Sequence, residues 1–184
     1  MLTTLVASCC VLASATVEPT PAEMAEAMKP PKEMAVLQSM VGKFKANMGY
    51  FWGINESKGT SSMSNQMILN GRYLQCMVDY TETTMGTQSG LLLMTYDAKA
   101  KQFRGDWRDS TTGTVLQMSG PGDKNGFTAT SEFAEDPMMG GRMQVVAKYE
   151  FKPKGVIHFR LDMRAEADQS KWMKLMEGDY TRTK

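Results

Sequence analysis

The strongest constraint on this chain is a hydrophobic pattern with a period of two that extends from Gly42 to Arg182. About ten short stretches alternate apolar and polar residues, and such a period places one face of each strand in a core. Tight turns separate the stretches; Asn70-Gly71 favours a two-residue hairpin because both positions accept positive φ. Strands joined by hairpins remove their exposed edges by closing on themselves. The sequence therefore predicts an all-β fold, an antiparallel up-and-down barrel of about ten strands.

The first expected strand, residues 43–54, shows the alternation most clearly. Phe44, Met48 and Trp52 share one side, and the lysines lie on the other. The last expected strand, 172–182, has apolar residues on both sides, so the pattern does not assign its inner face. The expected strands between them are 61–69, 72–80, 91–96, 102–110, 114–119, 126–133, 143–151 and 156–163.

Two helical segments are expected before the strands. Residues 18–32 carry four of the seven prolines and form a tether, within which residues 22–28 are good helix formers. Residues 33–41 place apolar side chains at helical spacing, and Gly42 follows where a C-terminal glycine is typical. We expect this second, short helix to cap one end of the barrel. The barrel domain then spans residues 33–184.

Residues 1–17 are apolar or small and carry no charge. They resemble the core of a secretory signal, with Ala13-Ser14-Ala15 as a cleavage site, but they lack the basic start because the first lysine is Lys29. Two interpretations follow. Either the true start lies farther upstream and the protein is secreted or periplasmic, or the segment is not a signal and the protein is cytoplasmic.

The three cysteines carry no disulfide, zinc or redox pattern. Val6-Ala7-Ser8-Cys9 resembles a lipobox that would place a lipid on Cys9, although the eight residues before Cys9 are too few for a complete signal. Cys76 lies within an expected strand and is interpreted as a small buried hydrophobic residue. No stretch is long enough for a transmembrane span.

The net charge and the methionine content limit the kinds of partner and ligand that are expected. With 21 Lys and Arg against 20 Asp and Glu, the net charge is +1, so nucleic acid is not an expected partner. The 18 methionines are flexible apolar residues that suit irregular cores and tolerant binding surfaces. Thioethers also bind copper(I), but the helical spacing of Met24, Met28, Met34 and Met40 is more typical of core packing. The sequence therefore predicts no metal site.

Several segments together carry a family resemblance. They are Thr95-Tyr96-Asp97, residues 103–110 (FRGDWRDS), residues 136–143 (DPMMGGRM), and residues 174–177 (KLME) with Tyr180 and Arg182. In combination they resemble the domain of unknown function 1579, over residues 34–183. The resemblance implies a mainly bacterial, often exported protein with a lipocalin-like, calycin-type barrel. It implies no activity, substrate or catalytic residue.

Barrels of the lipocalin type commonly open with Gly-x-Trp on the first strand and end with an arginine that lies across the indole. Here Gly42-Lys43-Phe44 and Arg182 are similar, with Phe44 in the place of the tryptophan. A cation–π contact with phenylalanine is weaker than one with tryptophan. We interpret the pair as a structural closure and not as a site.

The sequence contains few residues that could carry out catalysis or bind a cofactor. His158 is the only histidine, which excludes Ser-His-Asp, Cys-His and multi-histidine metal sites. Nitrobindin-like relatives of this barrel class hold haem through a histidine, but alternation places His158 beside Arg160 and Asp162 on the wet face of its strand. No cofactor is therefore predicted. Glu177 has no second carboxylate that the sequence can pair with it, so acid–base chemistry is a weak hypothesis.

Large, adaptable side chains gather on the expected inner faces, as is typical of a ligand cavity. Two polar residues accompany them. Asp109 either contacts a ligand or caps the turn after its strand, and Asn65 either orients a ligand or bonds to a neighbour or a buried water. The candidate ligand-binding residues are Phe44, Met48, Trp52, Asn65, Met67, Leu74, Tyr80, Trp107 and Asp109.

Three functions remain open from the sequence. The favoured hypothesis is a barrel that binds a small apolar or amphipathic molecule in its interior. The second is an enzyme, an isomerase or hydrolase, that uses Asp109 or Glu177 in the same cavity. The third is a structural or protein-binding barrel with a filled interior. The pattern carries no signal of oligomeric state.

Overall fold

The computed structural model describes residues 20–52, 55–83, 86–113, 115–136 and 139–183. Residues 1–17 and Cys9, for which a signal and a lipid anchor were considered, lie outside the described residues. The strands are β1 (Gly42–Trp52), β2 (Asn55–Ile68), β3 (Tyr73–Glu82), β4 (Gly86–Asp97), β5 (Gln102–Asp109), β6 (Val115–Gly120), β7 (Gly122–Asp123), β8 (Gly126–Ser131), β9 (Ala134–Asp136), β10 (Gly141–Lys152), β11 (Val156–Ala165) and β12 (Met173–Arg182).

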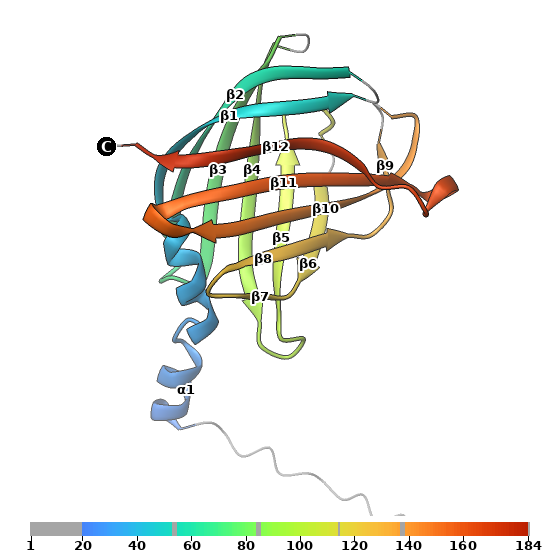
Figure 1. Cartoon of the computed structure of the whole chain (residues 1–184). Helices are drawn as coiled ribbons and strands as arrows, with labels where there is room; N and C mark the ends of the chain where they lie inside the picture. Colours follow the sequence, from blue (N-terminus) through green and yellow to red (C-terminus); the bar gives the residue numbers. More distant parts are fainter. Residues whose placement is uncertain (1–19, 53–54, 84–85, 114, 137–138, 184) are drawn as a thin grey trace, which may run out of the picture.

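Ten of these strands form a closed antiparallel barrel (Figure 1). Strands β1 to β6 pair in chain order, as do β10 to β12, and β1 pairs with β12. Strand β8 lies between β6 and β10 and closes the ring. The predicted fold class is confirmed. Asn70 and Gly71 have positive φ, but the turn is longer than the predicted two residues, because the last strand pair is Ile68 with Tyr73 and Leu69 has positive φ as well.

Two short strands and several strand ends were not predicted. Strands β7 and β9 flank the closing strand β8 and contribute only two and three residues. Strand β2 begins at Asn55, six residues before the expected start, because residues 55–60, which are polar or glycine, pair with the second half of β1. A strand segment without apolar residues shows no hydrophobic alternation, so the pattern cannot locate its end.

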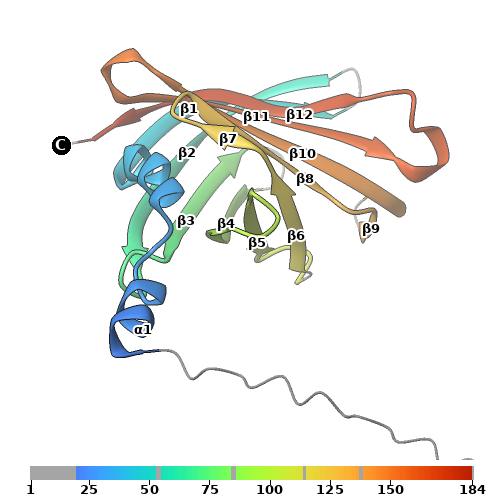
Figure 2. The same cartoon turned by 90° about the horizontal axis from the view of Figure 1, so that it is seen from below.

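The N-terminal segment contains the two expected helical pieces. Helix α1 (Pro21–Ala27) begins with a capping box between Thr20 and Glu23 and buries no residue. The second piece, η1 (Lys32–Met40), is a 3-10 helix and buries Met34, Leu37 and Met40 against one end of the barrel. Figures 1 and 2 show η1 on this end beside the start of β1, with α1 extending away from the barrel. The predicted cap is therefore present.

The first and last strands meet at this capped end. The Arg182 guanidinium lies 4.7 Å from the centroid of the Phe44 ring and donates hydrogen bonds to the carbonyls of Ser39 and Val41. Gly42 has a φ of +126°, and a Cβ placed on it would lie 2.2 Å from an Arg182 nitrogen. The predicted closure by Arg182 over Phe44 is confirmed, and it also ties the cap to the barrel.

We expect Arg182→Ala to lower the free energy of unfolding by about 1–3 kcal/mol, because two charge-assisted hydrogen bonds and the ring contact are lost. Arg182→Lys keeps the charge but loses the planar fork, so its loss should be intermediate. Guanidinium unfolding monitored by circular dichroism measures both. The control is Arg104→Ala, which removes an exposed ion pair with Asp97 and should cost less than about 1 kcal/mol. Equal losses for Arg182→Ala and Arg104→Ala would contradict the closure role.

Candidate functional site

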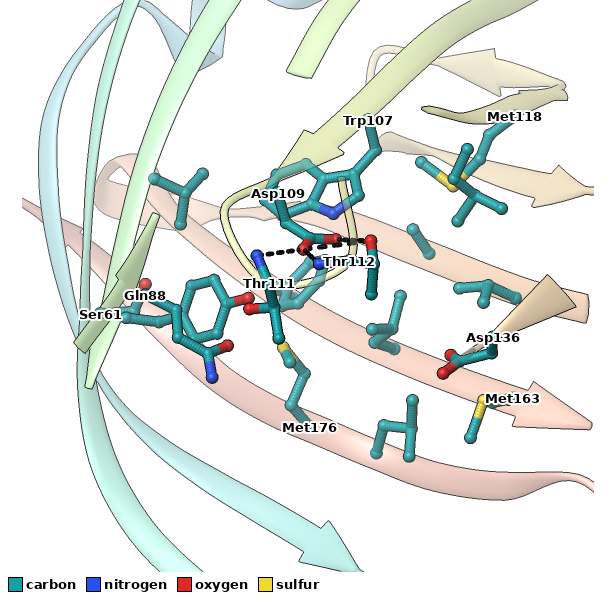
Figure 3. Close-up of a pocket in the computed structure, with 18 of the residues that line it drawn as sticks. Ser61, Gln88, Trp107, Asp109, Thr111, Thr112, Met118, Asp136, Met163 and Met176 are labelled. Atoms are coloured by element: carbon teal, nitrogen blue, oxygen red, sulfur yellow. Dashed lines mark hydrogen bonds between the residues drawn. The ribbon is translucent and has the colours of Figure 1, made fainter. Parts of the chain in front are cut away.

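A cavity of about 210 Å³ lies inside the barrel, in the half away from η1. Its wall is mostly apolar and includes six methionines: Met48, Met63, Met118, Met143, Met163 and Met176. Figure 3 shows Met118, Met163 and Met176 among the lining residues. The half next to η1 is filled instead, since Phe44, Leu74, Leu92 and Met94 pack there with at most 1% exposure. The barrel is therefore solid at its capped end and hollow toward the other.

The wall of the cavity is incomplete where the closing strand ends. Only two residue pairs join β6 to β8, and Ser131 is the last residue of β8. The Ser131 hydroxyl accepts a hydrogen bond from the Val145 amide at 2.9 Å, which fixes this strand end on β10. Beyond it the chain forms β9, which pairs with β10 and has no second strand partner in the described ranges. The start of β6 and β9 are not paired with each other in the described ranges, and we call this gap in the strand pairing the side opening; Val115 and Ala134, on its two sides, line the cavity.

Two glycines allow aromatic rings that line the cavity to pack directly against the backbone of neighbouring strands. The Trp107 indole lies flat on Gly90, where a Cβ would come within 2.0 Å of the ring. The Tyr50 ring crosses Gly59, whose Cβ would lie 2.9 Å from a ring carbon and 2.0 Å from the carbonyl oxygen of Thr81. Both glycines are required by close approach, and a larger residue would push an aromatic ring into the cavity.

Four tyrosines line the cavity, Tyr50, Tyr80, Tyr149 and Tyr180, and the hydroxyls of Tyr180 and Tyr50 differ in their hydrogen bonds. The Tyr180 hydroxyl donates to the Ser61 hydroxyl at 2.6 Å, and Ser61 donates onward to the carbonyl of Asp79 at 3.0 Å. The Tyr50 hydroxyl is buried and has no hydrogen-bond partner among the described residues. Burial raises the pKa of Tyr50 to about 12, with Tyr80 and Glu82 adding to the shift, and it raises the pKa of Tyr180 further. The hydroxyls are therefore protonated at neutral pH.

Asp109 lies at the rim of the cavity and caps a turn. Its carboxylate accepts hydrogen bonds from the amides of Thr111 and Thr112 at 2.8 and 2.7 Å (Figure 3). This is the turn cap that the sequence offered as one alternative, and the same carboxylate also lines the cavity. Burial, followed by the charge of Asp109, raises the pKa of Tyr80.

The structure brings four of the nine candidate residues together in the cavity wall: Met48, Tyr80, Trp107 and Asp109. The other described candidates lie elsewhere, because the inner face of a strand runs through both halves of the barrel. Phe44 and Leu74 fill the capped half, and Met67 packs against the same cluster. The Asn65 amide donates to the Met40 carbonyl at 2.9 Å and ties β2 to η1. The side chain of Trp52 lies outside the described residues.

Several lining residues were not selected from the sequence. Tyr50 and Ser61 share the inner faces of their strands with selected residues, so alternation alone would have found them. Glu82 does not line the cavity, but it is only 1% exposed and follows Tyr80 on the inner face of β3. It was missed because β3 extends two residues beyond its expected end. Tyr180 lies on β12, whose inner face the pattern did not assign.

A β-bulge explains why β12 has no simple alternation. Leu161 pairs with Met176 but Asp162 pairs with Lys174, so β12 holds one extra residue at Leu175. As a result Leu175 and Met176 both line the cavity, while Glu177 lies on the outer face. There Glu177 binds Lys174 at 2.7 Å, and this bond lowers its pKa.

The remaining chemical candidates are outside the cavity. His158 lies on the outer face, as alternation predicted, with its Nδ1 2.7 Å from Asp179. Cys76 is fully buried in the filled half, and burial raises the pKa of its thiol to about 12. Within the described ranges, no three His, Cys, Asp or Glu side chains are placed to hold a metal ion. No helix in this part of the chain is long and apolar enough to cross a membrane.

These features define a closed antiparallel β-barrel with a hollow, apolar half that opens beside its closing strand. Residues 29–182 match the family described as protein of unknown function, DUF1579, and the chain belongs to this family. No curated protein matches the chain.

We expect Gly90→Ala to displace the Trp107 indole and to lower the free energy of unfolding by about 1–3 kcal/mol, because the new methyl overlaps the ring. In a chain carrying Trp52→Phe and Trp172→Phe, the Trp107 emission maximum should shift to the red as the ring leaves its seat. Gly105→Ala is the control, since its Cβ meets only the flexible ends of Leu92 and Met94 at 3.0 and 3.4 Å. An unchanged Trp107 spectrum in Gly90→Ala would contradict this packing.

Proposed function

We propose that this protein binds a small molecule with an apolar body and one polar end inside the barrel. The observation that carries the proposal is the Tyr50 hydroxyl. Three buried polar side-chain atoms lack a partner among the described residues, and of these only the Tyr50 hydroxyl belongs to a residue that lines the cavity. A buried hydroxyl without a partner costs about 1–3 kcal/mol, and a polar atom of a ligand would satisfy it.

The size of the cavity limits the bound part of the ligand. An apolar cavity of about 150 Å³ is enough to bind benzene, so about 210 Å³ suits a single ring or a short chain. A longer molecule would extend through the side opening between β6 and β9. The methionines of the wall are flexible and polarizable, and they can adjust to ligands of different shapes.

The two alternatives receive less support. Catalysis by Asp109 would require a carboxylate that already accepts the hydrogen bonds of its turn, and Glu177 faces outward. A filled interior describes the capped half only. We also propose, from the uncharged apolar segment 1–17, that the barrel works outside the cytoplasm.

Native mass spectrometry of the gently purified full chain tests the proposal. We expect an added mass that is lost on denaturation. Val145→Phe, which places a ring in the cavity wall, should reduce its occupancy at least severalfold because it removes free volume. The matched control is Val156→Phe, on the outward side of β11 near the capped end, which should leave occupancy unchanged.

If native mass spectrometry shows no added mass, a ligand that binds weakly would have been lost during purification, and binding is then measured in solution. The second measurement is therefore a titration with small amphiphiles, followed by NMR shifts of the methionine methyl groups. Shifts confined to the six methionines of the cavity would support binding there. No added mass together with no shifts would contradict the proposal, and would indicate that water satisfies the Tyr50 hydroxyl.

A further inference from the structure

The charged groups that line the cavity all have the same sign. The lining contains the carboxylates of Asp109, Glu135 and Asp136, and no lysine, arginine or histidine among the described residues. The internal residues outside the description, 53–54, 84–85, 114 and 137–138, carry no charged side chain either. An anionic ligand would therefore find no counter-charge in this cavity.

Two of these carboxylates face the interior. Asp109 lies at the rim at the end of β5, and Asp136 lies across from it beside Met163 (Figure 3). In the register of β9 with β10, Asp136 alternates with Glu135, which pairs with the outward Arg142. The Asp136 carboxylate also accepts a hydrogen bond from the Met139 amide at 3.1 Å. Asp109 at the end of β5 and Asp136 at the end of β9 thus both belong to the cavity lining.

The basic residues on the strands around the cavity lie on the outer face; among them Arg108, beside Asp109 on β5, is exposed. Arg142 binds Glu166 at 2.7 Å and also donates to the carbonyl of Phe133. Lys174 binds Glu177 and lies over the Phe51 ring. Because no lysine, arginine or histidine among the described residues lines the cavity, the lining itself supplies no positive charge. A cleft lined by one sign of charge concentrates ions of the opposite sign.

The carboxylates also affect the pKa values of tyrosine hydroxyls inside the barrel. Asp109 and Glu82 raise the pKa values of Tyr80 and Tyr50, after the larger effect of burial. The Tyr50 hydroxyl, buried to 99% and without a hydrogen-bond partner among the described residues, has two lone pairs that can accept from an N–H donor. The faces of Trp107, Tyr80 and Tyr50 add the negative quadrupole that attracts cations.

Building on the proposed function, we propose that the ligand is a small protonated amine, with its ammonium group between Asp109, Asp136 and the Tyr50 hydroxyl and its apolar body against the methionines. The apolar body of such a ligand matches most of the cavity lining, and its positive charge matches the carboxylates of Asp109 and Asp136. Fatty acids and other carboxylates are excluded by the same arrangement, because they would be buried beside like charges with no cation to pair with.

Three probes of one shape test the inference: benzylamine, benzyl alcohol and benzoate. Calorimetric titration of the full chain at pH 7 and low salt should give the tightest binding for benzylamine, about tenfold tighter than benzyl alcohol, and none for benzoate. Added salt should weaken the binding of benzylamine and leave the binding of benzyl alcohol unchanged, because salt screens only the interaction of the charged probe.

Two conservative variants test whether the carboxylates of Asp109 and Asp136 attract the ammonium group. Asp109→Asn and Asp136→Asn keep an oxygen that accepts the turn hydrogen bonds but remove the charge, so each should reduce the preference for benzylamine over benzyl alcohol about threefold or more. Asp123→Asn is the matched control. Asp123 accepts the Asn125 amide at 2.7 Å in a turn of the same kind at the capped end, and its substitution should leave the preference unchanged.

The outcomes separate the two proposals. Benzoate or benzyl alcohol binding as tightly as benzylamine would overturn the amine assignment and would still support a small-molecule cavity. A preference that survives both Asp→Asn variants together would also overturn it, because the charge would then act elsewhere. No binding by any of the three probes would contradict the proposed function itself, and with it this inference.

Discussion

The pairing of β8 with β10 is the contact that makes a barrel out of this sheet. It joins the two halves of the chain through five residue pairs, from Gly126 with Glu150 to Thr130 with Val146. Phe127 and Tyr149 stack across it with their ring centroids 4.5 Å apart. Without this pairing the strands would form an open sheet with two long edges, which is a template for aggregation.

The stack at the closure is part of a longer row of rings. From Tyr96 through Phe103 it reaches Phe127 and Tyr149, and it continues through Phe159 to Tyr180, with centroids 4.5–6.4 Å apart. The row therefore crosses six strands, β4, β5, β8, β10, β11 and β12, and passes through the closure. It also divides the interior: the filled core lies on the side of η1, and Tyr149, Phe159 and Tyr180 form the floor of the cavity.

The cavity follows from how short the closing strand is. Strand β8 has six residues, whereas β10 has twelve, so β10 continues past the end of β8 and takes β9 as its partner instead. The strand that would complete the wall is thus replaced by three residues that pair on one side only. The side opening and the acidic residue Asp136 both lie at this one place.

The sequence predicted the barrel and the capped end because both depend on alternation and on local signals. Phe44, Leu74 and Arg182 lie where the pattern predicted a buried face and a closure. The boundary between filled core and cavity could not be predicted in this way, since an inward side chain looks the same in sequence whether neighbours or empty space face it. The inner face of β12 was hidden for a different reason, because a bulge at Leu175 breaks the period of two.

Small residues complete the physical account of the site. Gly59 and Gly90 lack the side chains that would keep Tyr50 and Trp107 away from the wall, so the rings lie flat and the space above them stays open. The interior polar groups are then of two kinds. Ser61, Ser131 and the amide nitrogen of Asn65 have their hydrogen bonds within the fold. The Tyr50 hydroxyl does not, although it is equally buried. Replacing Tyr50 with phenylalanine would remove a buried hydroxyl that has no partner among the described residues, so the fold alone gives no reason for a tyrosine at this position.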